Sequence, residues 1–365
     1  MLELKKGTII EEIFSRPGIA GYWVVVEGMK EKCIAYLDLI APLEPGDQVV
    51  LNTTAVSLKL GSGGYHFVLA NLSQVKHAVK PGGHIMKMRY SPMQVKVLSV
   101  EEPASPFHEQ LKSAESLEKT PVLAATLHSM LAPLCLKFKE DNLKVAYVMT
   151  DGAALPIAFS ETVDWLKNEQ LLTGTVTVGH AFGGDIEAVN IYSGLLAARV
   201  VFNPDVIIVG MGPGIVGTGT KWGFTGIEQG EILNAVEALD GIPIAVPRIS
   251  FADKRQRHQG ISHHTLTVLA RVCRVKAIVP LPALEEEKTA FILGQLQQEN
   301  LLDKYFCCLE ADDNIIEYMV KSQHRITTMG RGAEEDPDFF LSLGSAAQAT
   351  TKIIKGKTLN RINWA

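Results

Sequence analysis

The sequence lacks the marks of several classes of protein. Its five cysteines form no CxxC pair and are odd in number, which argues against a disulfide framework and against a cysteine-based zinc site. No apolar run approaches the roughly 20 residues that a membrane helix needs, and the N-terminus has no signal-peptide core. We therefore expect a cytoplasmic protein with no membrane partner.

Positive charge is also scarce. The chain has 35 Lys and Arg against 40 Asp and Glu, a formal charge of −5, and this overall balance argues against a nucleic-acid partner. The sequence contains neither the GxSxG turn of a nucleophilic serine nor the HExxH pair of a zinc protease. Hydrophobic content of 47% is typical of a globular protein with a sizeable core.

A length of 365 residues predicts two domains, because single cores stop growing near roughly 250 to 300 residues. Residues 1–100 contain short β-like runs between turn signals, which predicts a small antiparallel β-barrel. Residues 101–121 are polar, include Pro103 and Pro106, and are expected to form a linker. Residues 122–365 alternate strand and helix patterns, which indicates an α/β domain with a mostly parallel, Rossmann-like three-layer sheet.

The expected elements follow from these patterns. Barrel strands are predicted at 8–14, 22–27, 33–37, 48–51 and 65–69. Strands of the second domain are predicted at 122–126, 145–150, 174–178, 206–210, 242–249 and 277–280. Helices are predicted at 128–139, 155–170, 193–201, 227–239, 263–273, 284–299, 314–322 and 334–355.

A glycine-rich loop follows the predicted strand at 206–210. Such a loop can turn several backbone N–H groups toward one anion, so it is the first candidate ligand site. The candidate ligand-binding residues are Gly212, Gly214, Gly217, Gly219 and the nearby Lys221. The glycines fit GxGxxG, but the next strand ends in Arg248 and not in the acidic residue that holds a ribose, which argues against NAD. A tightly turned loop in a domain or subunit contact is the alternative.

The strand predicted at 242–249 ends in a second loop, rich in arginine and histidine. Arg248 and Arg257 are candidates to clamp a phosphate or carboxylate, with His258 beside them; a solvated loop is the alternative. His263 is a candidate for proton transfer. Because adjacent helical side chains point about 100° apart, we expect at most one of His263 and His264 to reach a shared site.

Two further strand ends carry titratable residues. Asp151 follows the strand at 145–150, and His180 and Asp185 follow the strand at 174–178. His180 is a candidate for proton transfer, with Asp151 and Asp185 orienting a histidine or binding a metal together with His258. Helix capping by Asp151 and a spacer role for His180 remain the simpler interpretations. The cofactor is unknown, with a divalent metal as an open alternative.

Several long blocks identify a resemblance. With LNTTAVSLKLGSGGYHFV, VAYVMTDGAALP, GTVTVGHAFGGDIEAV, GMGPGIVGTGTKWGFTG, RISFADKRQRHQGISHHTLT and TMGRG, the chain resembles a bacterial family known as domain-of-unknown-function family 3866. The resemblance covers nearly the whole length and implies a small β domain joined to a larger α/β domain. It implies no reaction, cofactor or catalytic residue.

These patterns together favour an enzyme that acts on a small anionic, phosphorylated metabolite at the carboxyl edge of the sheet. Hydrolysis or group transfer suits the candidate residues better than hydride transfer. Two alternatives stay open. The first is a regulatory module that binds a nucleotide or other metabolite without turnover. The second is a structural role of the glycine loop in a domain contact or a homo-oligomer.

Overall fold

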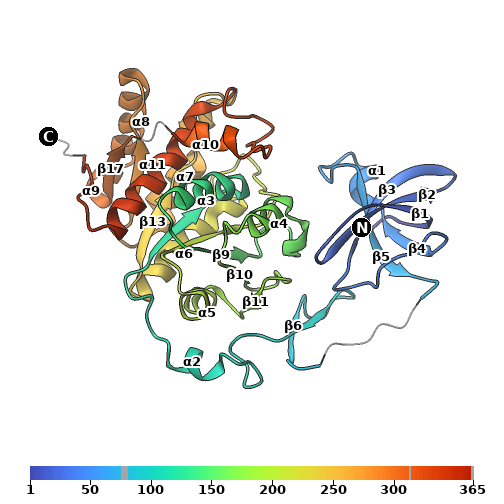
Figure 1. The fold of residues 1–365 in the computed structure, drawn as a ribbon. Helices are drawn as coiled ribbons and strands as arrows, with labels where there is room; N and C mark the ends of the chain where they lie inside the picture. The colour runs from blue at the N-terminus through green and yellow to red at the C-terminus, as the bar shows by residue number, and fades with distance from the viewer. Residues whose placement is uncertain (75–80, 312–313, 363–365) are drawn as a thin grey trace. The chain divides into compact units, whose positions relative to one another are not determined.

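The chain forms two units, each with its own hydrophobic core. The computed structural model describes residues 1–74, 81–311 and 314–362, drawn in Figure 1. The first unit contains Met1–Leu98 with Ala158–Asp164, and the second contains Ser99–Ile157 with Trp165–Ala365. The segment 101–121, expected as a linker, therefore lies in the second unit. Leu117 explains this difference, since its side chain is fully buried in the core of that unit.

The first unit is a closed five-stranded barrel, as the sequence predicts. Its strands follow one another around the barrel in the order β1-β2-β3-β5-β4, in which β3 and β5 run parallel. The bounds are β1 Leu4–Arg16, β2 Ile19–Val26, β3 Met29–Tyr36, β4 Gln48–Asn52 and β5 Tyr65–Asn71. Alternation places Tyr22, Val24 and Leu51 in the core. This unit also contains α1 (Thr54–Ser57) and the hairpin of β6 (Ile85–Lys87) and β7 (Val95–Val97).

The second unit is built on an eight-stranded sheet, and every pair of neighbours in it is parallel. The strand order is β11-β10-β9-β12-β8-β13-β16-β17. The bounds are β8 Pro121–Ala125, β9 Val145–Thr150, β10 Gly174–Thr177, β11 Ile186–Glu187, β12 Val206–Met211, β13 Ile242–Val246, β16 Ile278–Pro282 and β17 Phe306–Glu310. Their central residues are apolar and buried on both faces, as parallel strands between helices require.

Helices cover both faces of this sheet (Figure 1). Helices α3 (Leu131–Glu140), α10 (Ile315–Lys321) and α11 (Pro337–Ile354) pack together on one face. Helices α5 (Ile191–Ala197) and α6 (Glu228–Ala238) pack together on the other. The remaining helices are α2 His108–Ser113, α4 Glu161–Asn168, α7 His263–Thr267, α8 Glu286–Gln298 and α9 Leu301–Lys304. None of the helices in the described ranges has the length and apolar character required to cross a bilayer.

The strand order creates a switch point at the centre of the sheet. From β8 the chain moves outward through β9, β10 and β11, returns with β12 beside β8, and then continues with β13 on the other side of β8. The loop after β8 leads to α3 on one face of the sheet and the loop after its neighbour β12 leads to α6 on the other, so these two loops diverge. Open α/β sheets bind ligands in the crevice at such a point, outside the carboxyl ends of the strands.

The strand predicted at 242–249 is shorter in the structure. Pro247 lacks an N–H for the ladder, so β13 ends at Val246. Beyond it, β14 (Ile249–Ser250) pairs with β15 (Gly260–Ile261), which closes the loop that carries the arginines. The strand β17, with the sequence FCCLE, was not predicted, because its short pattern does not alternate.

Candidate functional site

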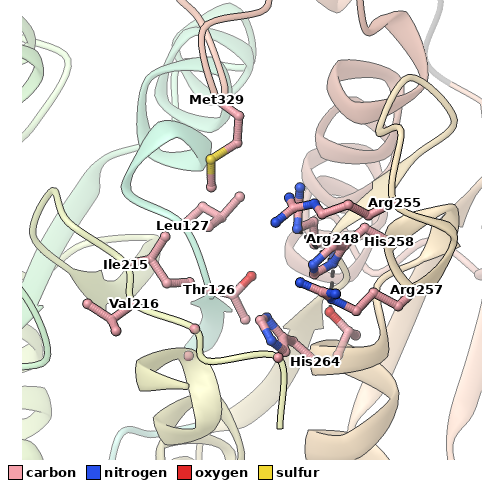
Figure 2. Close-up of a pocket in the computed structure, with 14 residues that line it drawn as sticks. Thr126, Leu127, Ile215, Val216, Arg248, Arg255, Arg257, His258, His264 and Met329 are labelled. Carbon is pink, nitrogen blue, oxygen red and sulfur yellow. Dashed lines mark hydrogen bonds between the residues drawn. The ribbon is translucent and has the colours of Figure 1, made fainter. Parts of the chain in front are cut away.

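A cavity of about 220 Å³ lies above the switch point (Figure 2). Its walls come from the loops after β8, β12 and β13, which are neighbours in the sheet, and from a loop ahead of α11. The lining residues are Thr126, Leu127, Ile215, Val216, Gly217, Gly219, Gly226, Arg248, Arg255, Arg257, His258, His264, Thr265 and Met329. The volume lies below the roughly 300 Å³ at which drug-sized pockets begin, so the cavity suits a small ligand.

The glycine loop after β12 closes on itself. The N–H of Thr225 donates to the carbonyl of Val216 at 2.9 Å, and the N–H of Thr218 donates to the carbonyl of Gly223 at 2.9 Å. Gly219 adopts a φ of +77°, a left-handed conformation that favours glycine. Among the described residues, the backbone N–H groups of Gly217 and Gly219 have no hydrogen-bond acceptor. Two backbone donors of the cavity wall are therefore available to a ligand.

The second loop holds its arginines through one buried carboxylate. Asp253 is only 4% exposed; its Oδ2 lies 3.0 Å from Arg248 and 2.8 Å from Arg255. Hydrogen bonds from the Arg255 guanidinium hold the pKa of Asp253 well below its usual range, so this carboxylate stays ionised. Arg257 is exposed and makes no ion pair with any residue that the structure describes.

Three histidines meet beside these arginines. The ring centroids of His263 and His264 lie 4.1 Å apart, and those of His258 lie 4.9 and 5.2 Å from them. Of these two adjacent histidines, of which we expected at most one to reach a shared site, only His264 lines the cavity, although both rings contact His258. Their backbone directions do differ, but χ rotation brings both rings onto His258. His264 is held further by stacking on Phe224, with ring centroids 4.0 Å apart.

The hydrogen bonds of His258 fix its tautomer. Arg248 donates to Nδ1 of His258 at 3.0 Å, and because a guanidinium cannot accept, this nitrogen is the acceptor. Ser262 Oγ lies 2.8 Å from the same nitrogen. Burial, reinforced by the Arg248 charge, lowers the pKa of His258 to about 3. The ring is therefore neutral near pH 7, with its proton on Nε2.

The other two rings are neutral as well. Burial and the neighbouring His263 lower the pKa of His264 to about 4. Burial and the charge of Arg257 lower the pKa of His263 below its usual value. Both rings therefore add hydrogen-bonding capacity to the site, but no charge.

The three histidines offer ligand atoms that all lie within 4.8 Å of one another, the spacing of a metal site. Their surroundings do not fit a cation. A metal-binding histidine normally donates its second N–H to a carboxylate or carbonyl, whereas Nδ1 of His258 accepts from Arg248. Coordination through Nε2 would place a proton on Nδ1, facing the guanidinium. Coordination through Nδ1 would break the bonds from Arg248 and Ser262. The donor set suits an anion better.

The charge of the cavity supports the same view. Three arginines line it, and Asp253, just outside the lining, neutralises one of them. With the histidines neutral, about two positive charges remain. Opposite the arginines, Leu127, Ile215, Val216 and Met329 form an apolar wall (Figure 2).

The structure brings together part of the predicted site. Gly217, Gly219, Arg248, Arg257 and His258 line the cavity, and His263 contacts His258. Six other predicted residues are not part of the lining: Gly212, Gly214, Lys221, His180, Asp151 and Asp185.

Four of these six residues have local roles or exposed positions instead. Asp151 accepts a hydrogen bond from the N–H of His180 at 2.8 Å, which links the ends of β9 and β10. Asp185 accepts from the N–H of Thr175 at 2.9 Å and pairs with Lys167, so it lies beside the first half of β10 and away from its carboxyl end. Lys221 is exposed at the tip of the closed glycine loop.

Sequence reasoning missed several residues of the site. Thr126, Leu127 and Met329 line the cavity, but none of them is titratable and none belongs to the glycine-rich loop. Thr126 and Leu127 directly follow β8, so the position after a predicted central strand was the available signal. Glu228 was also missed. It begins α6, accepts from Thr150 Oγ1 at 2.7 Å, and burial raises its pKa to about 7, but it does not line the cavity.

Fold and cavity define an α/β protein with an appended β-barrel and a small cationic cavity at the switch point of its parallel sheet. The chain belongs to the family described as "Protein of unknown function (DUF3866)", whose model matches residues 32–347. No curated protein and no solved structure matches the chain.

Proposed function

We propose that the cavity binds a small phosphorylated metabolite and that the protein is an enzyme that hydrolyses this metabolite or transfers its phosphoryl group. One observation carries the proposal: about two uncompensated positive charges face a cavity at the switch point of a parallel sheet. A phosphoryl dianion has the matching charge, and planar guanidinium groups bind its oxygens in pairs.

In this proposal each part of the ligand has a counterpart among the lining residues. Arg255 and Arg257 approach the phosphoryl oxygens from solvent, while Arg248 is fixed by His258 and Asp253 and adds charge from below. The N–H groups of Gly217 and Gly219 donate from the opposite loop. The apolar wall of Leu127, Ile215, Val216 and Met329, defined above, packs against the remainder of the metabolite.

His264 is the proton acceptor of this proposal, in place of His180, because its ring lines the cavity. In hydrolysis, the oxygen of a water attacks phosphorus while His264 takes the water's proton. The bond between phosphorus and the leaving oxygen breaks with its electron pair, and that oxygen takes a proton from the imidazolium. Group transfer follows the same course with an acceptor hydroxyl in place of water. A bound dianion raises the pKa of His264 from about 4 toward the range of an efficient base.

The test measures binding of inorganic phosphate by calorimetry. Arg257→Ala should weaken binding roughly tenfold or more, since a charge-assisted hydrogen bond contributes about 1.5 to 3 kcal/mol. Melting should stay unchanged, because Arg257 is exposed and has no carboxylate partner in the described chain. Lys254→Ala, an exposed cation in the same loop, is the matched control. Equal affinity of Arg257→Ala and the unaltered protein would refute the proposal.

Turnover separates the enzyme from a regulatory module. Phosphate esters of sugars, nucleosides and small alcohols are offered, and released phosphate is measured. His264→Gln should abolish release while inorganic phosphate still binds. Binding of esters without release or transfer in the unaltered protein would identify a regulatory site instead. We also propose a cytoplasmic location, because all five cysteines are free and a reducing compartment keeps them so.

A further inference from the structure

The outer face of the barrel carries an aromatic cluster that the cavity does not use. Trp23 on β2, Lys32 on β3 and Tyr65 on β5 are direct cross-strand partners in one row. Phe14 on β1 makes an edge contact with Tyr65, with ring centroids 6.5 Å apart. All three rings are half-buried, so each keeps surface exposed. We call Phe14, Trp23 and Tyr65 the aromatic platform.

The backbone explains why these rings face outward together. Tyr22 and Val24, which flank Trp23 along β2, point into the barrel core, so strand alternation places Trp23 outside. Phe14 lies opposite Gly21, where a Cβ would come within 2.2 Å of the Phe14 ring. Glycine at this position therefore lets Phe14 lie flat across β2.

Cationic side chains surround the platform. Lys32 Nζ lies between two rings, 5.4 Å from the centroid of Trp23 and 5.6 Å from that of Tyr65. Lys30 Nζ lies 4.6 Å from Trp23, and the Arg16 guanidinium lies 5.3 Å from Phe14. Lys30 also pairs with Glu11 at 2.9 Å, whereas Lys32 has no carboxylate partner among the residues described. Aromatic faces thus alternate with positive charge.

The charge of the chain is distributed unevenly along the sequence. Residues 1–98 contain 11 Lys and Arg against 8 Asp and Glu, whereas residues 99–365 contain 24 against 32. Residues 48–100 contain no acidic residue at all. The overall charge of −5, which argued against nucleic acid, is therefore an average over a positive segment, 1–98, and a negative segment, 99–365. Within the first segment the surplus lies in residues 72–98, since residues 1–71 contain 6 Lys and Arg against 8 Asp and Glu.

We propose that the aromatic platform binds single-stranded nucleic acid. Bases stack on exposed aromatic rings irrespective of sequence, and cations between the rings contact the phosphates that link successive bases. A neutral oligosaccharide would use the rings but not the lysines, and a folded duplex would present no free base faces. The combination of three rings with Arg16, Lys30 and Lys32 favours an extended polyanion with stacking groups.

The experiment uses the full chain and a fluorescent oligothymidylate of about a dozen nucleotides, a length in the range that small barrels cover. Anisotropy should show binding that weakens with added salt. Trp23→Ala and Tyr65→Ala should each weaken binding by roughly fivefold to a hundredfold, the fold-change for losing one stacked base. Lys32→Ala should weaken binding and reduce its salt dependence by about one phosphate contact.

Matched controls lie in the other unit. Trp222→Ala removes an exposed tryptophan and Lys321→Ala an exposed lysine, and neither should change binding. Trp23→Phe keeps a ring and should retain most of the affinity, which separates loss of stacking from loss of folding. The proposal is overturned if neither DNA nor RNA single strands bind at low salt. It is equally overturned if Trp23→Ala binds as the unaltered chain does, or if neutral oligosaccharides alone bind through Trp23.

Discussion

His258 is a buried histidine that resists protonation, and this makes its contribution to stability depend on pH. Its native pKa of about 3 lies below the value of about 6.5 in an unfolded chain. Below about pH 6.5, His258 binds a proton in the unfolded chain but not in the native protein. The free energy of unfolding therefore falls as pH drops from about 6.5 toward 3, and it is unaffected by this group above that window.

His258→Gln should flatten this dependence. Glutamine can still accept from Arg248 through its amide oxygen, but it binds no proton, so the slope should decrease by up to about 1.4 kcal/mol per pH unit. Urea unfolding between pH about 6.5 and 4 measures both slopes, and carboxylate titration contributes equally to each. Parallel curves for the two proteins would contradict the assigned tautomer and burial.

Sequence reasoning found those site residues whose side chains are charged or titratable. Arg248, Arg257 and His258 follow a strand end, and their charge or imidazole made them candidates without any structure. Thr126 and Met329 were missed, because a hydroxyl or a thioether becomes part of a site only through its place in space; for Thr126 the only signal was its position after a predicted strand. For His263 and His264 backbone direction alone did not predict the contact between their rings, which side-chain torsions produce, while only His264 lines the cavity.

At the scale of elements, α6 is positioned by a glycine. Gly230 faces the chain after α7, where a Cβ would lie 2.7 Å from Val272 Cγ1 and 3.0 Å from the backbone nitrogen of Cys273. A backbone atom cannot move aside without cost, so the close packing of α6 against this segment requires a residue without a side chain at position 230. Gly294 in α8 is the opposite case, since a Cβ there would meet nothing within 4 Å.

These two glycines give a matched prediction. Gly230→Ala should destabilise the protein by about 1 to 3 kcal/mol through overpacking. It should also weaken phosphate binding, because Gly226 of the cavity lies one turn ahead in the chain. Gly294→Ala should stabilise by about 0.5 to 1 kcal/mol, as alanine does in an open helical position. Denaturant midpoints measure both, and a shift of the same sign in both variants would contradict this packing.

Most elements were predictable from local pattern, while their order in the sheet was not. Val145–Thr150 and Val206–Met211 read as buried strands because they are short apolar runs bounded by turn signals. No local sequence pattern predicts that β12 lies between β9 and β8, because that pairing joins residues such as Val209 and Ala124 that are distant in sequence. The cavity depends on this order, so its loops were predicted but its exact lining was not.

At the scale of the whole molecule, two separate hydrophobic cores predict two unfolding events. Calorimetry should resolve two transitions, with inorganic phosphate raising only that of the α/β unit and oligothymidylate only that of the barrel. A ligand at a hundred times its Kd stabilises its unit by about 2.7 kcal/mol. Arg257→Ala should remove the first shift and Trp23→Ala the second. A single transition raised by both ligands would contradict independent units.

The central strand β8 lies between β12 and β13, and both of these neighbours are encoded well after it. During synthesis on the ribosome, Pro121–Ala125 therefore leaves the exit tunnel with both edges unpaired, and it stays so until residues 206–211 and 242–246 have followed. An apolar segment that stays unpaired for this length of synthesis exposes hydrophobic surface to which chaperones bind. Expression yield of this protein should accordingly depend on translation speed and on holdase supply more than its native stability would suggest.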